Sequence, residues 1–138
     1  MSEATERVER NQLVINQFRA NGGVLGGGGL PMLLLTTTGA RTGRRLTSPM
    51  AYATDGDRLI VFAANGGRPQ NPNWLHNLRA APDAHVEVGT DSFDVRATIT
   101  EGAERDRLWT AQLRTAPFFA DFQARAGRVI PVVALTRV

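Results

Sequence analysis

The chain has 138 residues, a net charge of +3 and no cysteine. This length suffices for one hydrophobic core but leaves no room for a separate cofactor domain. The lack of cysteine excludes disulfides, thiolate nucleophiles and cysteine-based metal sites, and two histidines are too few for a histidine-rich centre, so we predict no metal site. All 16 basic residues are arginine, with acids interspersed, which is not the pattern of a nucleic-acid-binding protein.

The N-terminal part is predicted to form a helix over residues 5–20, with Val8, Ile15 and Phe18 on one stripe. The glycine-rich stretch 22–29 follows as a loop, because so many glycines disfavour a regular element. The first ten residues are charged and lack the apolar core of a secretory signal. The apolar run 30–35 is far too short to span a membrane. We therefore expect a cytoplasmic protein.

The rest of the chain alternates strand and helix signals. Strands are predicted over residues 32–38, 48–54, 58–64, 84–88, 93–100 and 129–136. A helix should begin with Asn71 as its N-cap and Pro72 at its first position, and further helices are predicted over 103–114 and 118–124. This order favours a mainly β protein with flanking helices, a six-stranded antiparallel barrel and not a repeat of parallel units. Residues 1–30 would precede a barrel domain over 31–138.

The turn after the first strand, Gly39 to Arg45, combines two glycines with three arginines. Glycine lets the backbone turn tightly and expose its amides, and guanidinium groups bind phosphate or carboxylate oxygens. The turn therefore suits a polyanionic ligand, although a solvated hairpin tip explains the same residues equally well. Its spacing is not that of a Walker A loop, which also needs a lysine.

The second stretch of interest runs from Ala63 to Pro72. Small residues at a strand end, followed by Gly66 and Gly67, would let a flat ring lie against the backbone. On its own, such a stretch is more often an ordinary loop.

Five blocks together resemble the deazaflavin-dependent (coenzyme F-420) nitroreductase family: residues 33–43, Pro49, 64–67, 71–78 and 128–133. The resemblance implies an FMN-binding split-barrel-like fold and coenzyme F-420 as cofactor, an 8-hydroxy-5-deazaflavin whose tail carries a phosphodiester and a polyglutamate chain. It also implies an F-420H2-dependent reductase that passes hydride to a quinone, a nitroaromatic compound, or an activated enone or unsaturated lactone.

Carried over position by position, the resemblance implies cofactor-binding roles for Arg41, Thr42, Gly43, Arg44, Arg45, Ser48, Pro49, Met50, Ala64, Asn65, Gly66, Gly67, Asn73, Trp74 and Asn77. The residues of the basic turn would hold the phosphate, those of 48–50 and 64–67 would lie along the ring, and those of 73–77 would line the cleft. Two positions depart from the family. Asn65 stands where many relatives have lysine, and Leu46 where a basic residue is frequent, so either change would weaken one phosphate contact unless Arg68 or Arg45 replaces it.

The aromatic segment Phe118, Phe119 and Phe122 corresponds to a helix that covers the substrate pocket in the family. Some relatives have tyrosines there, whereas this chain would have an apolar lid without a hydroxyl that could donate a proton. Ser48 and Tyr52 are then the remaining weak candidates, with solvent as the alternative donor and no certain catalytic side chain. Phe118 could equally be a core residue.

Four further positions, two tryptophans and two histidines, give weaker evidence of function. Trp109 is expected to be structural, and Trp74 fits either a core or a cleft position. Neither His76 nor His85 shows a pattern typical of a catalytic triad.

The favoured interpretation is therefore a hydride-transferring reductase for flat apolar acceptors. Two alternatives remain open: an FMN-dependent reductase of the same fold, and a non-catalytic carrier of a deazaflavin or fatty acid. The expected partner is a small molecule, and peripheral membrane contact would follow if the acceptor is a lipid quinone. The sequence leaves the natural acceptor, the proton donor and the oligomeric state open.

Overall fold

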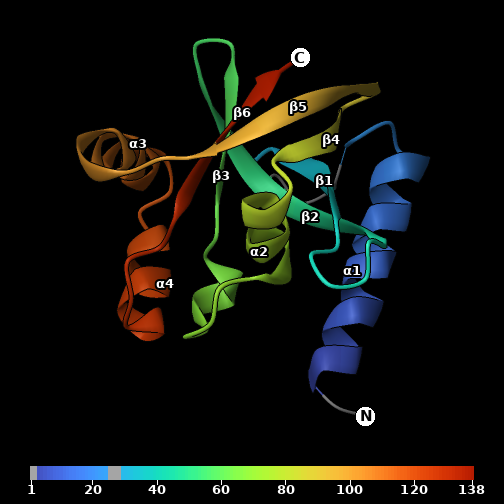
Figure 1. Ribbon diagram of the computed structural model, residues 1–138. Coiled ribbons are helices and arrows are strands. Elements are labelled where there is room, and N and C mark those ends of the chain that lie inside the picture. The colour runs from blue at the N-terminus through green and yellow to red at the C-terminus, as the bar shows by residue number, and fades with distance from the viewer. Residues whose placement is uncertain (1–2, 25–28) are drawn as a thin grey trace.

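The computed structural model describes residues 3–24 and 29–138, with only the backbone described at residues 3–5. These described residues form six strands, four α-helices and a 3-10 turn (Figure 1). The strands are β1 (Met32–Thr38), β2 (Arg45–Asp55), β3 (Arg58–Phe62), β4 (Asp83–Val88), β5 (Asp91–Ile99) and β6 (Val132–Arg137). The helices are α1 (Glu3–Ala20), α2 (Asn73–Ala80), α3 (Gly102–Thr115) and α4 (Phe119–Ala126), and the 3-10 turn is η1 (Asn65–Gly67).

The strands close into an antiparallel barrel in the order β1-β2-β3-β6-β5-β4, with β4 pairing back to β1. Short hairpins set the register: Asp55 pairs with Arg58 across Gly56, whose φ of 59° suits a tight turn. The predicted mainly β fold, a six-stranded antiparallel barrel with flanking helices, is confirmed.

The barrel interior is filled by alternating side chains of its strands. On β1, Leu33 and Leu35 face inward, whereas Leu34 faces outward and packs against Ile15 and Phe18 of α1. Helix α2 adds Trp74, Leu75 and Leu78 to the interior cluster. Full burial of one such side chain stabilises the fold by about 1.5–3 kcal/mol, so this interior is the main source of stability.

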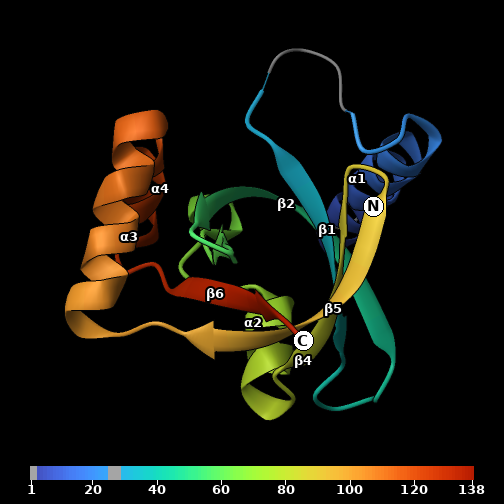
Figure 2. The same ribbon diagram turned by 90° about the horizontal axis from the view of Figure 1, so that it is seen from above.

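A second apolar cluster covers the outer face of β3 and β6. There Phe62, Trp109 and Phe119 form a triangle of rings with centroids 5.5 to 6.2 Å apart. Figure 2 shows α3 and α4 on this side of the barrel and α1 on the opposite side. Trp109 is buried in this cluster, as its helical position predicted.

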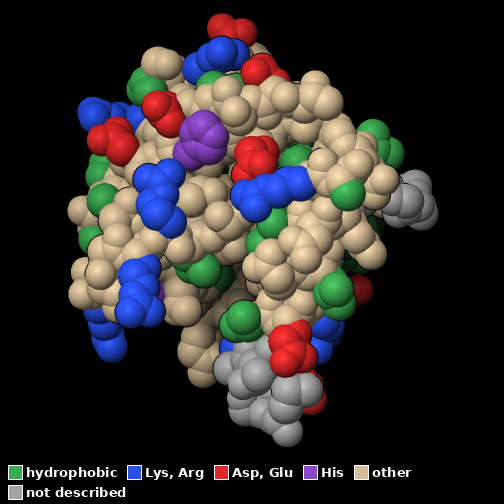
Figure 3. Space-filling model, turned by 90° about the vertical axis from the view of Figure 1, so that its right-hand side faces the viewer, with side chains coloured by type: hydrophobic (Ala, Val, Ile, Leu, Met, Phe, Trp, Pro, Cys, Tyr) green, Lys and Arg blue, Asp and Glu red, His purple; other side chains and the backbone are tan. Residues whose placement is uncertain are grey.

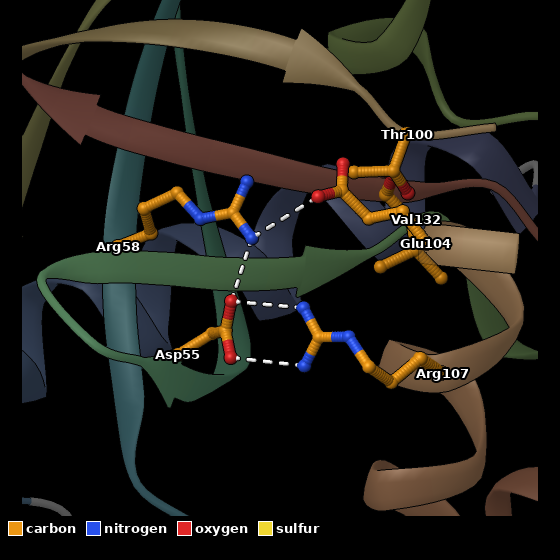
Figure 4. A network of polar contacts seen from close by, with 6 residues as sticks. All are labelled: Asp55, Arg58, Thr100, Glu104, Arg107 and Val132. Atoms are coloured by element: carbon orange, nitrogen blue, oxygen red, sulfur yellow. Dashed lines mark hydrogen bonds and ion pairs between the residues drawn. The ribbon is translucent and has the colours of Figure 1, made fainter.

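A polar network ties the β2–β3 hairpin to α3 (Figure 4). Arg58 donates to Asp55 Oδ2 at 2.6 Å, and Arg107 donates to both carboxylate oxygens at 3.1 and 3.2 Å. Arg58 also reaches Glu104 at 3.5 Å. The hydrogen bonds from Arg107 and Arg58 lower the pKa of Asp55 to about 2.

The described face around α1 and β4 carries acidic and basic side chains side by side (Figure 3). One of its ion pairs joins Arg19 of α1 to Glu87 of β4 at 2.9 Å. No large field of one sign lies on the described part of this face, in agreement with the modest net charge of +3. Within the described residues, no helix is both long and apolar enough to cross a membrane.

Three sequence predictions need correction. Helix α2 begins at Asn73 with Pro72 as its N-cap, so Asn71 is not the cap; its side chain instead accepts a hydrogen bond from Arg128. Strand β2 begins at Arg45, three residues earlier than predicted, and β6 begins at Val132, three residues later. Of the predicted glycine-rich loop, residues 25–28 lie outside the described residues.

Candidate active site

A cavity of about 860 Å³ opens between the barrel and its helices. This volume lies within the usual range for sites that bind cofactors or drug-sized molecules. Eleven predicted site residues contribute to its wall: Ser48, Pro49, Met50, Ala64, Asn65, Gly66, Asn73, Trp74, Phe118, Phe119 and Phe122. The fold therefore brings predicted site residues from four separate segments together in one cavity.

One wall is the first half of β2, where the barrel is open. Residues 45–51 of β2 pair only with β1, and pairing with β3 starts at Tyr52. Pro49 has no N–H to donate, and this stretch tolerates it because one edge of β2 has no neighbouring strand. Ser48 and Met50 lie on the same side as Leu35 and Leu33, with only 9% of each surface exposed. Ser48, Pro49 and Met50 line the cavity, so this edge of β2 provides a mostly apolar wall.

The opposite wall is the loop from Ala64 to Asn73, which contains η1. Asn65, Gly66 and Gly67 have φ values of 50°, 64° and 83°, a left-handed run that glycine adopts readily. The Asn65 side chain donates to Gln70 O at 2.9 Å. Asparagine tolerates this conformation better than lysine, and its amide also closes the loop. The departure at position 65 therefore has a local structural reason.

Arg128 organises this loop from beneath, a role that the sequence analysis missed. Its guanidinium donates to Asn71 Oδ1 at 2.6 Å and to the carbonyl oxygens of Ala63 and Gln70, each at 3.1 Å. Contacts to Arg68 O at 3.2 Å and Ala64 O at 3.4 Å complete the set. Burial lowers the pKa of Arg128 from its ordinary value. Arg128 thus holds the shape of the cavity wall.

The basic turn lies at the end of the β2 wall, directly before Leu46, which lines the cavity. Gly39 N donates to Arg44 O at 2.7 Å, Gly43 N donates to Gly39 O at 2.9 Å, and Arg44 N donates to Thr42 Oγ1 at 3.1 Å. A Cβ at Gly39 would lie 2.8 Å from Thr42 Oγ1, so the turn needs glycine there. These contacts fix the backbone of a turn whose arginine side chains are exposed.

The arginines of this turn are exposed and available to a ligand. Arg41, Arg44 and Arg45 form no ion pair or hydrogen bond through their side chains with any residue that the structure describes. They do not line the cavity itself, and Thr42 and Gly43 do not either. The predicted phosphate-binding residues therefore lie outside the cavity, in the turn that leads into β2.

Two predicted cleft residues are placed beneath the surface. Asn77 is 6% exposed, accepts from Ala40 N at 2.9 Å and donates to Thr37 Oγ1 at 3.0 Å. It supports the basic turn and does not line the cavity. Gly67 is buried against α4, with Arg125 and Phe122 within 3.5 Å of the position that a Cβ would take.

The aromatic segment, at the start of α4, forms a further wall of the cavity. Ring centroids of Phe118, Phe119 and Phe122 lie 5.2 to 5.8 Å apart in edge-on and tilted arrangements. Phe118 is 50% exposed at the mouth, whereas Phe119 is 5% exposed and also packs into the outer cluster. Phe118 is therefore a rim residue, while Phe119 belongs to both the cavity and the core.

The two candidate hydroxyl donors lie in different places. Ser48 lines the large cavity, whereas Tyr52 lines a smaller one of about 390 Å³ beneath α3. His76 is exposed on α2, and His85 Nδ1 lies 2.9 Å from Asp94 Oδ1, away from both cavities. Among the residues considered as proton donors, only Ser48 lines the large cavity.

Comparisons with known proteins identify the group to which this site belongs. The family model for F-420H(2)-dependent quinone reductase matches residues 10–137. The F-420H(2)-dependent quinone reductase Rv1261c of Mycobacterium tuberculosis is 42% identical over 113 residues, 80% of this chain and 76% of that protein.

Solved structures agree with this match. The F-420-H2 dependent reductase FDR-A superposes with a TM-score of 0.69 at 31% identity, covering 79% of this chain and 99% of that one. A protein described as a domain-swapped dimer gives a TM-score of 0.71 at 29% identity, covering 96% of this chain and 99% of that one. The chain therefore belongs to the F-420H(2)-dependent quinone reductase family, a family of split-barrel enzymes whose cofactor is coenzyme F-420.

Proposed function

We propose that this chain binds reduced coenzyme F-420 in the large cleft and reduces a flat, apolar acceptor. One observation carries the proposal: the open edge of β2 and the loop at 64–73 enclose a cavity of about 860 Å³, and three exposed arginines lie in the turn that leads into β2. A planar ring joined to a polyanionic tail has that same division into an apolar part and a charged part.

The residues present fit this cofactor. Arg41, Arg44 and Arg45 would bind the phosphodiester and glutamate tail, because guanidinium groups pair with such oxygens in a bidentate manner. Thr42 and Gly43 would present the turn, and Asn77 would hold it in place. Ser48, Pro49, Met50 and Trp74 would lie along the ring, with Ala64 to Gly66 and Asn73 on the other side, while the buried Gly67 would support this loop from within.

Hydride transfer from the cofactor would require little catalytic chemistry from the side chains. When bound, the reduced cofactor supplies a hydride, and the protein's task is to hold donor and acceptor together and exclude water. Phe118, Phe119 and Phe122 would cover the acceptor and keep water out. Ser48 is the remaining side chain that could pass a proton, and solvent is the other source.

The acceptor should be flat and apolar. The aromatic wall contributes ring surfaces and no hydroxyl groups, which favours quinones, nitroaromatic compounds and activated enones over small polar acceptors. We place the deazaflavin-binding unit within residues 31–138 and expect it to act in the cytoplasm, with membrane contact only if its quinone is a lipid.

The test is a titration of the purified protein with coenzyme F-420, followed by fluorescence, and then oxidation of the reduced cofactor after addition of menadione. Tight binding and acceptor-dependent oxidation are expected. Binding without oxidation would favour a carrier, whereas binding of FMN in place of F-420 would favour a flavin enzyme. Turnover of small polar acceptors with rejection of menadione would contradict the acceptor class.

A further inference from the structure

Helix α1 packs on the outside of the barrel and contributes to the wall of the large cavity. Its stripe of Ile15 and Phe18 packs on Leu34 of β1, and the same stripe continues toward the N-terminus through Asn11 and Val8. Arg7, Val8 and Asn11 all line the large cavity. Figure 1 shows the N-terminal end of α1 at the same end of the molecule as α4 and η1.

Arg7 is the residue of this wall with an unused hydrogen-bonding group. Its Nε is shielded from solvent and has no hydrogen-bond acceptor among the described residues. The rest of its guanidinium also forms no ion pair or hydrogen bond with a described residue. The other arginine in the cavity wall, Arg68, donates Nη1 to Asn65 O at 3.1 Å and so is part of the loop opposite. A buried donor without an acceptor is costly, and a ligand oxygen would remove that cost.

We infer that Arg7 contacts the acceptor and stabilises the negative charge that hydride transfer places on it, an inference that rests on the proposed function. Hydride transfer to a quinone adds two electrons and one hydrogen and leaves a hydroquinone anion, which takes one proton from solvent to give the hydroquinone. A fixed cation beside the oxygen that becomes negative lowers the barrier more than it tightens binding of the neutral quinone.

The position of Arg7 assigns it to the acceptor and not to the cofactor tail. The tail already has the three exposed arginines of the 39–45 turn, which lie outside the cavity. Arg7 shares the cavity with the aromatic wall, which contributes no hydroxyl group. It also precedes the region that matches the family model, so this contact belongs to the chain's own N-terminal segment.

The test compares Arg7→Gln and Arg7→Lys with the control Arg10→Gln, which alters an exposed arginine of α1 that does not line the cavity. Three quantities are measured: the Kd for F-420 by fluorescence, the Kd of menadione for the complex with oxidised cofactor by tryptophan quenching, and kcat for menadione reduction. Thermal unfolding checks that each variant is folded.

We expect Arg7→Gln to lower kcat by about 100-fold, the lower end of the loss that follows removal of one donor to a developing oxyanion, with both Kd values within about two-fold. Arg7→Lys should retain part of the rate, and Arg10→Gln should match the unaltered protein. An unchanged kcat in Arg7→Gln, or a loss confined to the Kd for F-420, would overturn the inference while leaving the proposed function intact. No oxidation by the unaltered protein would instead contradict the proposed function itself, and the inference with it.

Discussion

At the scale of single residues, Arg128 shows how one side chain can shape a site without lining it. Its guanidinium satisfies carbonyl oxygens at four positions of the loop, together with the side chain of Asn71. Gln70 O also accepts from the Asn65 side chain and Ala64 O from Gly67 N, whereas no other donor among the described residues is given for the Asn71 side chain. A buried acceptor left without a donor costs about 1–3 kcal/mol. The loop therefore depends on this residue for its conformation.

Replacing Arg128 with Met should weaken cofactor binding because the loop loses its anchor. We expect the Kd for F-420 to rise by at least about 10-fold, since losing one charged hydrogen bond changes a free energy by about 1.5–3 kcal/mol. Arg128→Lys should recover only part of this affinity, because one ammonium group cannot reach all five acceptors. The control is Arg79→Met, an exposed arginine of α2; equal affinities in Arg128→Met and Arg79→Met would contradict the assigned role.

Asp55 provides a residue-scale prediction about pH. The pKa of Asp55 in the folded protein is about 2, lowered chiefly by hydrogen bonds from Arg107 and then Arg58. The unfolded value is about 3.9, so this contribution to stability is present above about pH 4 and is lost as the pH falls through about 2. Asp55→Asn should therefore unfold at lower denaturant concentration at pH 7.

The difference between unaltered protein and Asp55→Asn should shrink when the pH is lowered from about 4 to about 2. Chemical denaturation at several pH values measures this. Asp57→Asn, in the same hairpin and without an ion pair to a described residue, serves as the control. A difference between Asp55→Asn and unaltered protein that stays constant down to pH 2 would show that the network contributes through packing and not through charge.

At the scale of elements, the C-terminal end of α1 is fixed by the close approach of two turns. Gly23 N donates to Phe18 O at 2.8 Å, which ends the helix. A Cβ at Gly23 would lie 2.3 Å from the Cα of Gly89, in the turn between β4 and β5. Only glycine allows this contact, so the seating of α1 on the barrel depends on it.

Gly23→Ala should displace α1 and lower the melting temperature by several degrees, because both its φ of 82° and the contact with Gly89 disfavour a side chain. Gly89→Ala is a matched control, since that residue also has a positive φ, 60°, but open space around its Cβ. If the two variants melted at the same temperature, the close approach would not matter. Thermal unfolding followed by circular dichroism makes the comparison.

The elements differ in how far the sequence predicted them. Hairpins were predictable where glycine marks a turn, as at Gly56 and at Gly43, because a positive φ leaves few other residues possible. The N-cap of α2 was not predictable, because an asparagine can either cap a helix or accept a hydrogen bond from a residue that is distant in sequence. In the structure, Asn71 accepts from Arg128. The start of β6 also differs from the prediction because of a tertiary contact. Ile130 N donates to Gln123 Oε1 of α4, so Ile130 lies outside the strand pairing.

The site residues show the same division. The segments that line the cavity could be identified from family-like blocks, since Ser48 to Met50, Ala64 to Gly66 and the three phenylalanines do meet in one cavity. The contribution of Arg128 could not be identified from the sequence. Four of its five acceptors are main-chain carbonyl oxygens, which every residue type provides. The position of Arg7 in the cavity wall could not be predicted either, because the apolar stripe of a helix does not reveal which part of the barrel the helix will cover.

At the scale of the whole molecule, the proposed function assigns two binding roles to β2 and to the turn that precedes it. The open edge of β2 provides an apolar strip within the cavity, and the turn before it carries exposed positive charge. A ligand that is flat and apolar at one end and polyanionic at the other would use both. If such a ligand binds here, the apolar strip and the charged turn contribute independently to its affinity.

The most direct test is to titrate the unaltered protein and a triple variant, Arg41→Gln with Arg44→Gln and Arg45→Gln, with two ligands. One ligand is coenzyme F-420, and the other is the same deazaflavin chromophore without its phosphodiester and glutamate tail. The account predicts that the unaltered protein binds F-420 at least about 10-fold more tightly than the tail-less ligand, as expected for several charge-assisted contacts. In the triple variant this preference should nearly vanish, while affinity for the tail-less ligand stays unchanged. An equal preference for F-420 in both proteins would contradict the account, because the tail would then be bound somewhere other than the basic turn.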